Sequence, residues 1–387
     1  MNILFVTAYP PVLHMHGGGV RMFHNIRILA EKHSVRVVTF IESDAERELL
    51  RSLDGICESV TAVRRVPDFR PHWLSLHPFL VREFSTPEMY RAVESEFQKK
   101  RVDVLQCEYL QTAQFYRRGI LNVLTLHEAL CGNAWEVFQR EADPIGKLRN
   151  FYRWMATLHY EVSMCRKFDR VVTMTEDDAA YLRSYSRAAN IRAIPIGVDT
   201  AEFAPHPEDL ARPIEVLFVG NFRHQPNVEA AEFLVQCVAP HFPDIRFMIF
   251  GSHVPDHLRS APNASFPGYV LDTRMLYLRP NTIVAAPLFS GTGQRVKLLE
   301  AFAMACPVIT TSVGAKGFPL RNGIEAFIAD TPEQFLTSLK QLVSSIDLRT
   351  RLGFNARRMI ELDFTWHRIG QELLAVINPA PPGVVIL

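Results

Sequence analysis

The sequence predicts an α/β protein of two similar halves, each a parallel β-sheet covered by helices. Along most of the chain, short apolar runs rich in β-formers alternate with amphipathic patterns, as in sheets whose strands are joined by crossover helices. This alternation breaks once, near residues 196–213, and then starts again. A chain of 387 residues is also longer than one hydrophobic core usually supports, so two domains are expected.

The first half contains strand-like runs with helical stretches between them. The predicted strands are residues 3–7, 35–39, 60–63, 102–106, 123–126, 171–174 and 191–194. The clearest helical pattern spans about residues 147–167, where aromatic and aliphatic side chains recur at helical spacing on one side of Arg149, Arg153 and Glu161.

A Pro-rich polar stretch, EFAPHPEDLARP at residues 202–213, predicts a linker, after which the alternation restarts. The predicted elements of the second half are strands at 215–220, 246–251, 265–270, 282–288 and 307–311, and helices at 227–238 and 297–305. Helical patterns continue beyond residue 330, and a last amphipathic segment begins near residue 364. We therefore expect domains at residues 1–205 and 206–363, followed by a C-terminal helix and tail at 364–387.

Composition and charge narrow the class of protein. Hydrophobic residues make up 48% and charged residues 21%, the balance of a soluble globular enzyme. The net charge of +1 provides no global attraction to nucleic acid, so no nucleic-acid partner is expected. No apolar run reaches the roughly 18 residues that a membrane span needs. The first residues, MNILFVTAYPP, carry no basic leader, which favours a cytoplasmic protein.

The most informative segment is residues 287–311, PLFSGTGQRVKLLEAFAMACPVITT, in which a buried strand leads through glycines into a helix. Gly291 and Gly293 let the backbone approach a ligand, and the free N–H groups at the helix start favour phosphate. Arg295 and Lys297 add positive charge there, although ordinary surface charge is the alternative. Glu300 lies among apolar residues and needs hydroxyl or N–H partners, such as those of a ribose. A solvated helix carboxylate is the alternative for Glu300.

Polar residues and glycines also follow other predicted strands. In the second half, Gly220, Asn221 and Arg223 come directly after strand 215–220, where open α/β sheets bind ligands. A contact of Arg223 with phosphate or sugar is plausible there, and a solvent-facing loop cation is the alternative.

In the first half, Gly17, Gly18 and Gly19 immediately precede a helical pattern, with a spacing unlike the dinucleotide-binding fingerprint. His127 and Glu128 follow strand 123–126, and Glu108 ends another candidate strand. His127 can hydrogen-bond a sugar hydroxyl as a neutral imidazole, whereas a purely structural histidine is the alternative.

Four segments together resemble the GT-B glycosyltransferases of family four, also called glycosyl transferases group one. Residues 291–303 resemble the family's donor signature in its Gly-Thr-x-x-Arg-x-Lys-x-Leu-Glu-Ala-x-Ala variant. The other segments are TMTEDDAAYL at 173–182, IPIGVDTAEFAP at 194–205 and LFVGNFRHQPNVEAAEFL at 217–234. The resemblance extends over nearly the whole chain.

The resemblance implies two Rossmann-like domains whose parallel sheets face each other across a cleft, with the last helix crossing back to the first domain. The implied reaction is the transfer of a sugar, typically a hexose, with retention of configuration. The donor would be a UDP- or GDP-sugar and the acceptor a hydroxyl of a glycan or lipid-linked molecule, as in polysaccharide or glycolipid synthesis.

The resemblance also implies roles for individual residues. Glu300 would bind the ribose, and the backbone at Gly291 to Gly293 with nearby cations would engage the diphosphate. The loop with Gly18 and Gly19 would approach the diphosphate and sugar, and His127 would contact the donor sugar. We assign His127 and Glu300 to catalysis. Many members carry a second glutamate where this chain has Thr292. No Asp-x-Asp pair follows a predicted strand, so neither a metal nor another cofactor is expected.

Two other functions stay open at this stage. A non-catalytic subunit that binds a nucleotide-sugar would explain Thr292. A nucleotide-sugar epimerase of the GT-B fold is the other alternative, but acid–base pairs of carboxylates are not evident.

Residues 63–85 mix arginines with aromatic residues, which suits a peripheral contact with the inner membrane face or a lipid-linked acceptor. A partly buried connecting segment is the alternative for these residues.

Overall fold

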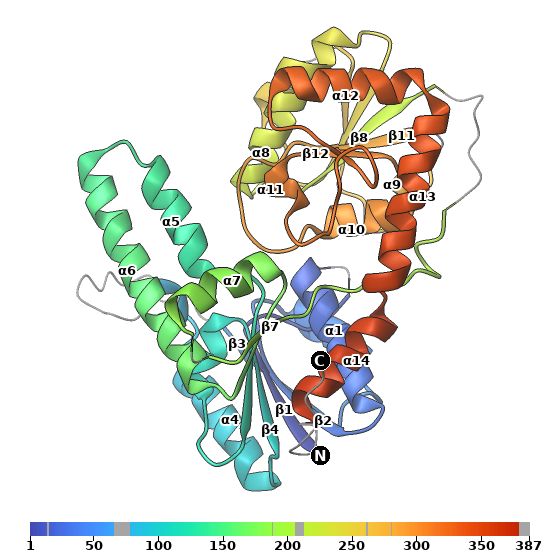
Figure 1. The fold of residues 1–387 in the computed structure, drawn as a ribbon. Coiled ribbons are helices and arrows are strands. Elements are labelled where there is room, and N and C mark those ends of the chain that lie inside the picture. The colour runs from blue at the N-terminus through green and yellow to red at the C-terminus, as the bar shows by residue number, and fades with distance from the viewer. Residues whose placement is uncertain are drawn as a thin grey trace. The chain divides into compact units, whose positions relative to one another are not determined.

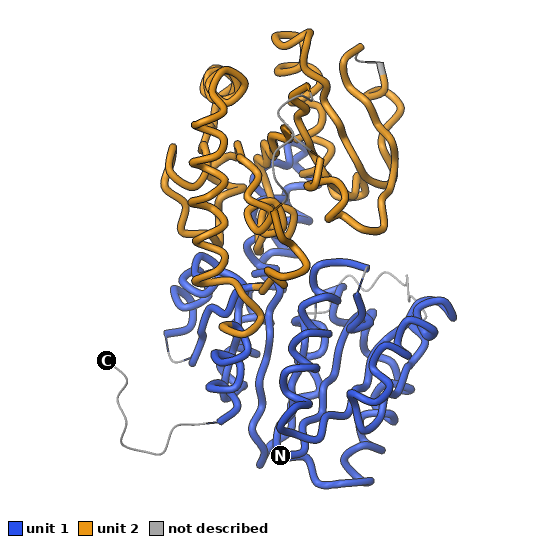
Figure 2. The backbone as a smooth tube through the Cα atoms, turned by 90° about the vertical axis from the view of Figure 1, so that its right-hand side faces the viewer, with its two compact units in different colours: residues 1–195, 369–387 blue, residues 196–368 orange. Residues whose placement is uncertain are grey.

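The computed structural model describes residues 1–13, 15–65, 78–187, 189–205, 213–260, 262–279 and 281–378. The chain divides into two compact units (Figure 2). The first unit contains residues 1–195 and the chain from residue 369 onward, and the second unit contains residues 196–368.

The first unit contains a seven-stranded parallel sheet in the order β3-β2-β1-β4-β5-β6-β7 (Figure 1). Its strands are β1 (Asn2–Thr7), β2 (Ser34–Ile41), β3 (Ser59–Arg64), β4 (Val104–Glu108), β5 (Leu121–Leu126), β6 (Arg170–Thr173) and β7 (Ile191–Ala193). Strand β1 is buried from Ile3 onward, as expected for a parallel strand covered on both faces.

The described helices of the first unit fall between and around these strands. They are α1 (Gly17–Ala30), α2 (Asp44–Leu49), the 3₁₀ turn η1 (Leu50–Leu53), α3 (Phe79–Arg82), α4 (Pro87–Lys99), the 3₁₀ turn η2 (Leu110–Phe115), α5 (Leu130–Arg140), α6 (Pro144–Lys167) and α7 (Glu176–Tyr185). Helix α6 begins earlier than residue 147 because Asp143 caps its first turn and Pro144 suits the first helical position.

The second unit contains a six-stranded parallel sheet in the order β10-β9-β8-β11-β12-β13. Its strands are β8 (Glu215–Val219), β9 (Arg246–Phe250), β10 (Ala264–Gly268), β11 (Thr282–Ala286), β12 (Val308–Thr310) and β13 (Phe327–Ile328). Together, the two parallel sheets confirm the predicted α/β class.

The described helices of the second unit include several short turns. They are α8 (Gln225–Glu232), the π-helical η3 (Phe233–Val238), the 3₁₀ turns η4 (Ala239–His241) and η5 (Asp256–Ser260), α9 (Arg274–Tyr277), α10 (Val296–Ala303), α11 (Ser312–Ala315), α12 (Pro332–Ser344) and α13 (Ile346–Asp363). Thr331 and Gln334 form a capping box that starts α12.

The units part between Pro195 and Ile196, earlier than the linker expected at residues 202–213. The reason is that the chain after Pro195 is already bonded to the second unit. The backbone N–H of Ile196 donates to Oε1 of Gln294 at 2.5 Å, and that of Val198 donates to the carbonyl of Phe364 at 2.8 Å. Residues 206–212 of the expected linker lie outside the described residues.

The last helix, α14 (Trp366–Ile377), starts in the second unit and belongs to the first unit from Ile369 onward. Within the first unit, α14 lies against α1 (Figure 1). A Cβ atom on Gly370 would be 3.0 Å from Cγ2 of Ile28, so the two helices approach closely at this glycine. Buried Ile369 and Leu373 attach the helix to the first unit's core.

Helices α5 and α6 form an antiparallel hairpin that Glu161 holds at its base. The Glu161 side chain is fully buried on α6, and its carboxylate accepts from the backbone N–H groups of Leu130 at 3.1 Å and Cys131 at 2.8 Å. No side chain caps α5 at its own N-cap residue, Ala129. Glu161 therefore takes the place of the missing cap.

We expect Glu161→Ala to lower the free energy of unfolding by about 1–3 kcal/mol, because two buried N–H groups lose their acceptor. Urea unfolding followed by circular dichroism measures this change. Burial raises the pKa of Glu161 to about 7 from its ordinary value of 4.5. Between these pH values the folded state holds more protons than the unfolded state, so stability falls as pH rises.

Glu161→Gln removes this titration and should flatten the fall in stability between about pH 4.5 and 7. The wild type measured over the same pH range is the comparison. An identical slope in both proteins would contradict the assignment of the titration to Glu161.

Candidate functional site

The strand order of the second sheet brings two predicted loops together. Strands β8 and β11 are parallel neighbours, and the strand order changes direction between them: β9 and β10 follow on one side of β8, and β12 and β13 follow on the other side of β11. The loops that leave the carboxyl ends of these strands, residues 220–224 and 287–295, therefore start side by side. In open α/β sheets this switch point is where ligands bind.

The loop after β11 is shaped by two glycines and one arginine. Gly291 has φ +99° and Gly293 has φ +75°, both in the left-handed region that favours glycine. The guanidinium of Arg295 turns back onto this loop and donates to the carbonyls of Thr292 at 2.5 Å and Gly291 at 2.7 Å. Arg295 thus holds the loop in shape, a contact that its charge alone did not indicate.

Lys297 connects the two loops through Asn227. Its Nζ donates to Oδ1 of Asn227 at 2.6 Å, and Nδ2 of Asn227 donates to the carbonyl of Asn221 at 2.8 Å. A Cβ atom on Gly220 would be 2.8 Å from Cγ of Asn227, so glycine is needed for this approach. Asn227 was not predicted from the sequence as a site residue, although it lies just after strand β8 in the segment that resembles the family.

The charge of Lys297 depends on its surroundings. Burial, with a smaller effect from Arg295, lowers the pKa of Lys297 to about 7. Its ammonium also lies 4.4 Å from the ring centroid of Phe218. An arriving phosphate would favour the charged ammonium and raise this pKa again.

Glu300 is a residue of α10, and its side chain contacts α9 and the residue before it. Its carboxylate accepts hydrogen bonds from the side chains of Thr273 and Tyr277. Burial raises the pKa of Glu300 to about 7, and these hydrogen bonds oppose the rise. Glu300 is therefore not a fully solvated helix carboxylate. Thr273 and Tyr277 were not predicted from the sequence, because the short α9 carries no motif.

The remaining predicted residues of the second unit lie on the outside of the loop after β8. Asn221 and Arg223 are exposed, and the backbone N–H of Arg223 donates to Oδ1 of Asn221 at 3.0 Å. The structure thus joins Asn221 and Lys297 by hydrogen bonds through Asn227, with Gly220 packed close to Asn227, while the Arg223 side chain is exposed.

The first sheet has its own switch point, between β1 and β4. The glycines expected to precede the helix form its first turn, because α1 begins at Gly17. His16 caps this turn, and its Nδ1 accepts from the backbone N–H of Gly19 at 3.1 Å. A Cβ atom on Gly19 would be 2.8 Å from the carbonyl oxygen of Val12. Close packing at the turn therefore requires glycine there.

His127 is held in place from two sides. Its Nε2 lies 2.8 Å from Oε2 of Glu108, whose side chain is fully buried. The imidazole also stacks on the ring of Tyr109, with centroids 3.8 Å apart and an interplanar angle of 8°. Because a carboxylate accepts, Nε2 carries the proton in the neutral imidazole and Nδ1 is left as an acceptor.

The electrostatic surroundings keep both histidines of this cluster neutral at physiological pH. Burial lowers the pKa of His127, although the hydrogen bond to Glu108 opposes the shift. Burial, followed by the charge of His127, lowers the pKa of His16 to about 4. Neutral imidazoles of this kind accept and donate hydrogen bonds without carrying charge.

Arg21 lies fully buried beside this cluster. Its Nη1 donates to the carbonyl of Ile194 at 2.7 Å, and Nε and Nη2 have no hydrogen-bond partner among the described residues. Burial lowers the pKa of Arg21 to about 10, and the charge of Glu108 opposes this. Arg21, Tyr109 and His16 were not predicted from the sequence, since no local motif marks them.

The predicted membrane or lipid contact at residues 63–85 falls mostly on residues that the structure does not describe. Most of the mixed basic and aromatic stretch, residues 66–77, lies outside the described residues. Among its described neighbours, Phe84 is buried and Phe79 is exposed. No three His, Cys, Asp or Glu side chains gather into a metal-binding group in the described part of the chain. The described helices include none long and apolar enough to cross a bilayer.

The comparisons with known proteins agree across both halves of the chain. The family model "Glycosyltransferase Family 4" matches residues 15–202, and "Glycosyl transferases group 1" matches residues 213–345. An uncharacterized 44.6 kDa protein in the cps region of Klebsiella pneumoniae is 20% identical over 384 residues, covering 94% of this chain and 96% of that protein.

Two solved structures are similar over nearly the whole chain. Sucrose-phosphate synthase from Thermosynechococcus elongatus has a TM-score of 0.73 at 17% identity, covering 97% of this chain and 98% of that one. HepE of Anabaena in complex with UDP-glucose has a TM-score of 0.70 at 15% identity, covering 97% and 99%. The fold is therefore the two-domain GT-B fold of glycosyltransferases. The chain belongs to the group 1 glycosyltransferases.

Proposed function

We propose that this protein transfers a hexose from a UDP- or GDP-sugar to an acceptor hydroxyl, with retention of configuration and without a metal. The observation that carries the proposal is the glycine loop between β11 and α10, with Glu300 further along α10. This loop presents backbone N–H groups at a helix start, where phosphate is favoured. The UDP-glucose bound to HepE of Anabaena supports the same class of donor.

In the proposed complex, the second unit binds the nucleotide. The ribose hydroxyls donate to the carboxylate of Glu300, and the diphosphate accepts from N–H groups of the loop that contains Gly291, Thr292 and Gly293. Lys297 adds a positive charge that the phosphate itself strengthens by raising the ammonium pKa. These groups stabilise the charge that builds on the leaving diphosphate.

The first unit supplies the polar groups around the sugar. We place His127 there as an acceptor, with Glu108 orienting the imidazole and with the helix turn of Gly18 and Gly19 beside the diphosphate and sugar. In the reaction, the bond between the sugar and the phosphate oxygen breaks as the acceptor oxygen bonds to the same sugar carbon. The departing phosphate takes the acceptor proton on the same face, so no protein nucleophile is required.

The acceptor class that we propose rests on one relative. The cps-region relative supports an acceptor in polysaccharide or other glycoconjugate synthesis. A glycan or lipid-linked hydroxyl is therefore the acceptor we propose.

The test is a panel of UDP-, GDP- and ADP-sugars with purified protein and with candidate glycan and lipid-linked acceptors. Release of nucleoside diphosphate together with an α-linked product from an α-linked donor, in the presence of EDTA, is the expected result. Nucleotide binding without release would instead support a non-catalytic subunit, which Thr292 favours. A change in the sugar while it stays attached to the nucleotide would support an epimerase.

Gly18→Ala is expected to lower the transfer rate at least about tenfold, because the stacked rings of Tyr109 and His127 must move away from the new methyl group. A Cβ atom at this position would be 1.8 Å from the hydroxyl of Tyr109 and 3.0 Å from Nδ1 of His127. Initial rates at saturating donor measure the loss. Tyr109→Phe removes the atom in closest contact, so adding it to Gly18→Ala should recover part of the rate. A wild-type rate in Gly18→Ala alone would contradict the predicted crowding.

A further inference from the structure

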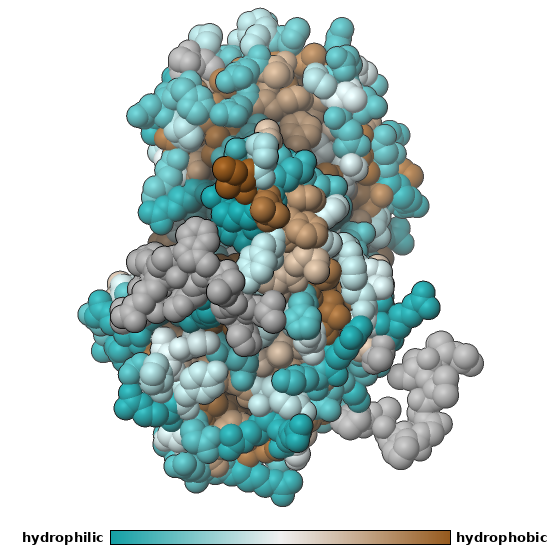
Figure 3. Space-filling model, turned by 90° about the vertical axis from the view of Figure 1, so that its left-hand side faces the viewer, coloured by the Kyte–Doolittle hydropathy of each residue, from teal (hydrophilic) through white to brown (hydrophobic). Residues whose placement is uncertain are grey.

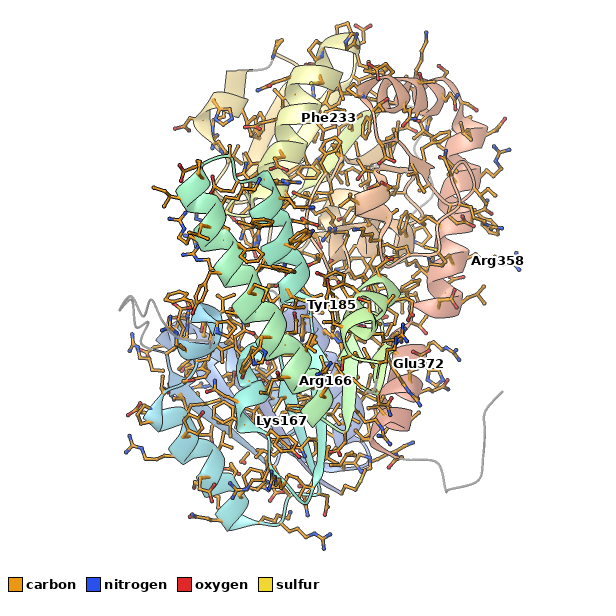
Figure 4. The ribbon with its side chains drawn as sticks, turned by 60° about the vertical axis from the view of Figure 1, so that its left-hand side comes forward. Arg166, Lys167, Tyr185, Phe233, Arg358 and Glu372 are labelled. Carbon is orange, nitrogen blue, oxygen red and sulfur yellow. The ribbon has the colours of Figure 1, made fainter. Side chains whose placement is uncertain are left out.

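The α5–α6 hairpin carries an apolar surface that the fold itself does not use. The two helices stand side by side and project as a pair from the first unit's sheet (Figures 1 and 4). We propose that the first half of α6, residues 144–155, binds the surface of a lipid bilayer that contains anionic headgroups. This inference is independent of the proposed sugar transfer.

The apolar side chains of this segment form one stripe. The exposed members are Ile145 (78% exposed), Leu148 (72%), Met155 (46%), Tyr152 (41%) and Phe151 (40%). At about 100° per residue they fall within an arc of roughly 120°. Gly146 and Asn150 are buried and lie on the opposite side of the helix. The stripe therefore faces away from the buried side of α6.

Basic residues border this stripe on both edges. Arg149 and Arg153 fall along one edge and Lys147 along the other, and all three are exposed. Between residues 144 and 160 the helix contains no Asp or Glu. An apolar face flanked by cations is the pattern of a helix that lies in a membrane interface. Long basic side chains reach the headgroups while their stems stay in apolar surroundings.

Ile145 and Leu148 of the stripe are not needed to hold the hairpin together. Aromatic rings form the contacts between the two helices. Trp135 of α5 and Trp154 of α6 have ring centroids 4.6 Å apart, and Phe138 of α5 and Phe151 of α6 have centroids 5.6 Å apart. With Glu161 bonding the base, the hairpin is stabilised without Ile145 or Leu148. Their exposure therefore leaves apolar area available to a partner.

A lipid surface fits this stripe better than a second copy of the chain. Figure 3 views the side on which the hairpin projects and shows apolar side chains, in brown, gathered near its outer end. A two-fold dimer would pair the stripe with itself and bring the flanking cations of both copies together. Anionic headgroups neutralise these cations instead.

The experiment is co-sedimentation of the full-length protein with vesicles of phosphatidylcholine alone or mixed with phosphatidylglycerol. We expect binding to the anionic vesicles that weakens as salt is raised, since surface charges are screened. Ile145→Glu with Leu148→Glu should abolish it. Charge reversal at Lys147, Arg149 and Arg153 should lower the partition coefficient of the protein onto anionic vesicles at least about a hundredfold, because each lost cation weakens binding roughly fivefold.

Matched controls separate the surface from general effects of charge. Phe354→Glu with Leu362→Glu changes two similarly exposed apolar residues on α13, and should leave binding unchanged. Reversing the exposed cations Arg118, Lys340 and Arg351 should change partition far less than the α6 set.

Three outcomes would overturn the proposal. These are no binding of the wild type to either vesicle, equal binding by the α6 variants, and a dimer in light scattering that Ile145→Glu with Leu148→Glu dissolves. Donor binding measured in solution should be the same in all variants, so failure here is distinct from failure of the proposed transfer.

Discussion

Glu300→Ala is expected to weaken the binding of UDP or GDP about ten- to a hundredfold while the protein stays folded. A hydrogen bond to a charged group contributes roughly 1.5–3 kcal/mol, which corresponds to this range in Kd. Thr273 and Tyr277 hold the Glu300 carboxylate in place on α10, and the Tyr277 hydroxyl keeps a second partner, since it lies 3.1 Å from the carbonyl oxygen of Lys297. Isothermal titration calorimetry measures the affinity, and thermal unfolding measures the fold.

The pH dependence of binding gives a second test of Glu300. Because its pKa is about 7, the carboxylate is increasingly ionised as pH rises through neutrality. Ribose hydroxyls donate to the ionised form, so Glu300 should strengthen binding as pH rises. Lys297 loses charge over the same range and acts in the opposite direction.

Glu300→Gln separates these two effects, because it keeps the shape and removes only the titration. The affinity of the wild type relative to Glu300→Gln should therefore grow from pH 6 to 8, about one unit on each side of the Glu300 pKa. A constant ratio, or an unchanged affinity in Glu300→Ala, would remove Glu300 from the nucleotide site.

His127→Ala is expected to lower kcat about ten- to a hundredfold and to change the Kd of the free nucleotide little. The loss corresponds to one hydrogen bond made to the reacting sugar, at roughly 1.5–3 kcal/mol. The nucleotide contacts that we propose are in the second unit, so they remain. Steady-state rates at saturating donor, together with calorimetry of UDP binding, separate the two quantities. A wild-type rate would refute the role of His127.

Glu108→Gln tests whether the carboxylate positions the imidazole. The hydrogen bond that Nε2 of His127 donates to Glu108 raises the pKa of His127, so loss of the carboxylate should lower that pKa further. If the neutral imidazole is the active form, the acid limb of the rate profile should move to lower pH in this variant. A merely structural role of Glu108 would lower the rate without moving the limb.

The apolar strands of both sheets were predicted closely from the sequence, whereas strands with polar ends or only two residues were not. Runs such as residues 3–7 and 282–288 were placed well, because buried parallel strands are continuous apolar segments. Strand β4 was predicted at 102–106 and lies at Val104–Glu108. Its end is polar, and Gln106 and Glu108 are tolerated there because Nε2 of Gln106 donates to Oε1 of Glu108 at 3.0 Å. Strand β13 was missed, because two residues carry no pattern.

By itself, the sequence determined the two-part α/β organisation, the order of the strands along the chain and the glycine loop that opens onto α10. These features repeat or lie close together along the chain, so local periodicity and spacing reveal them. Only the tertiary structure decided that Arg295 bonds its own loop, that Asn227 joins Lys297 to Asn221, and that the apolar stripe of α6 faces solvent. The Asn227 contact joins Lys297 to a residue 70 positions away, so no short stretch of sequence contains both partners. Arg295 lies only three and four residues from its acceptors, but the folded loop decides whether its guanidinium turns back onto these carbonyls or into solvent. The exposure of the α6 stripe likewise depends on which segments pack against it.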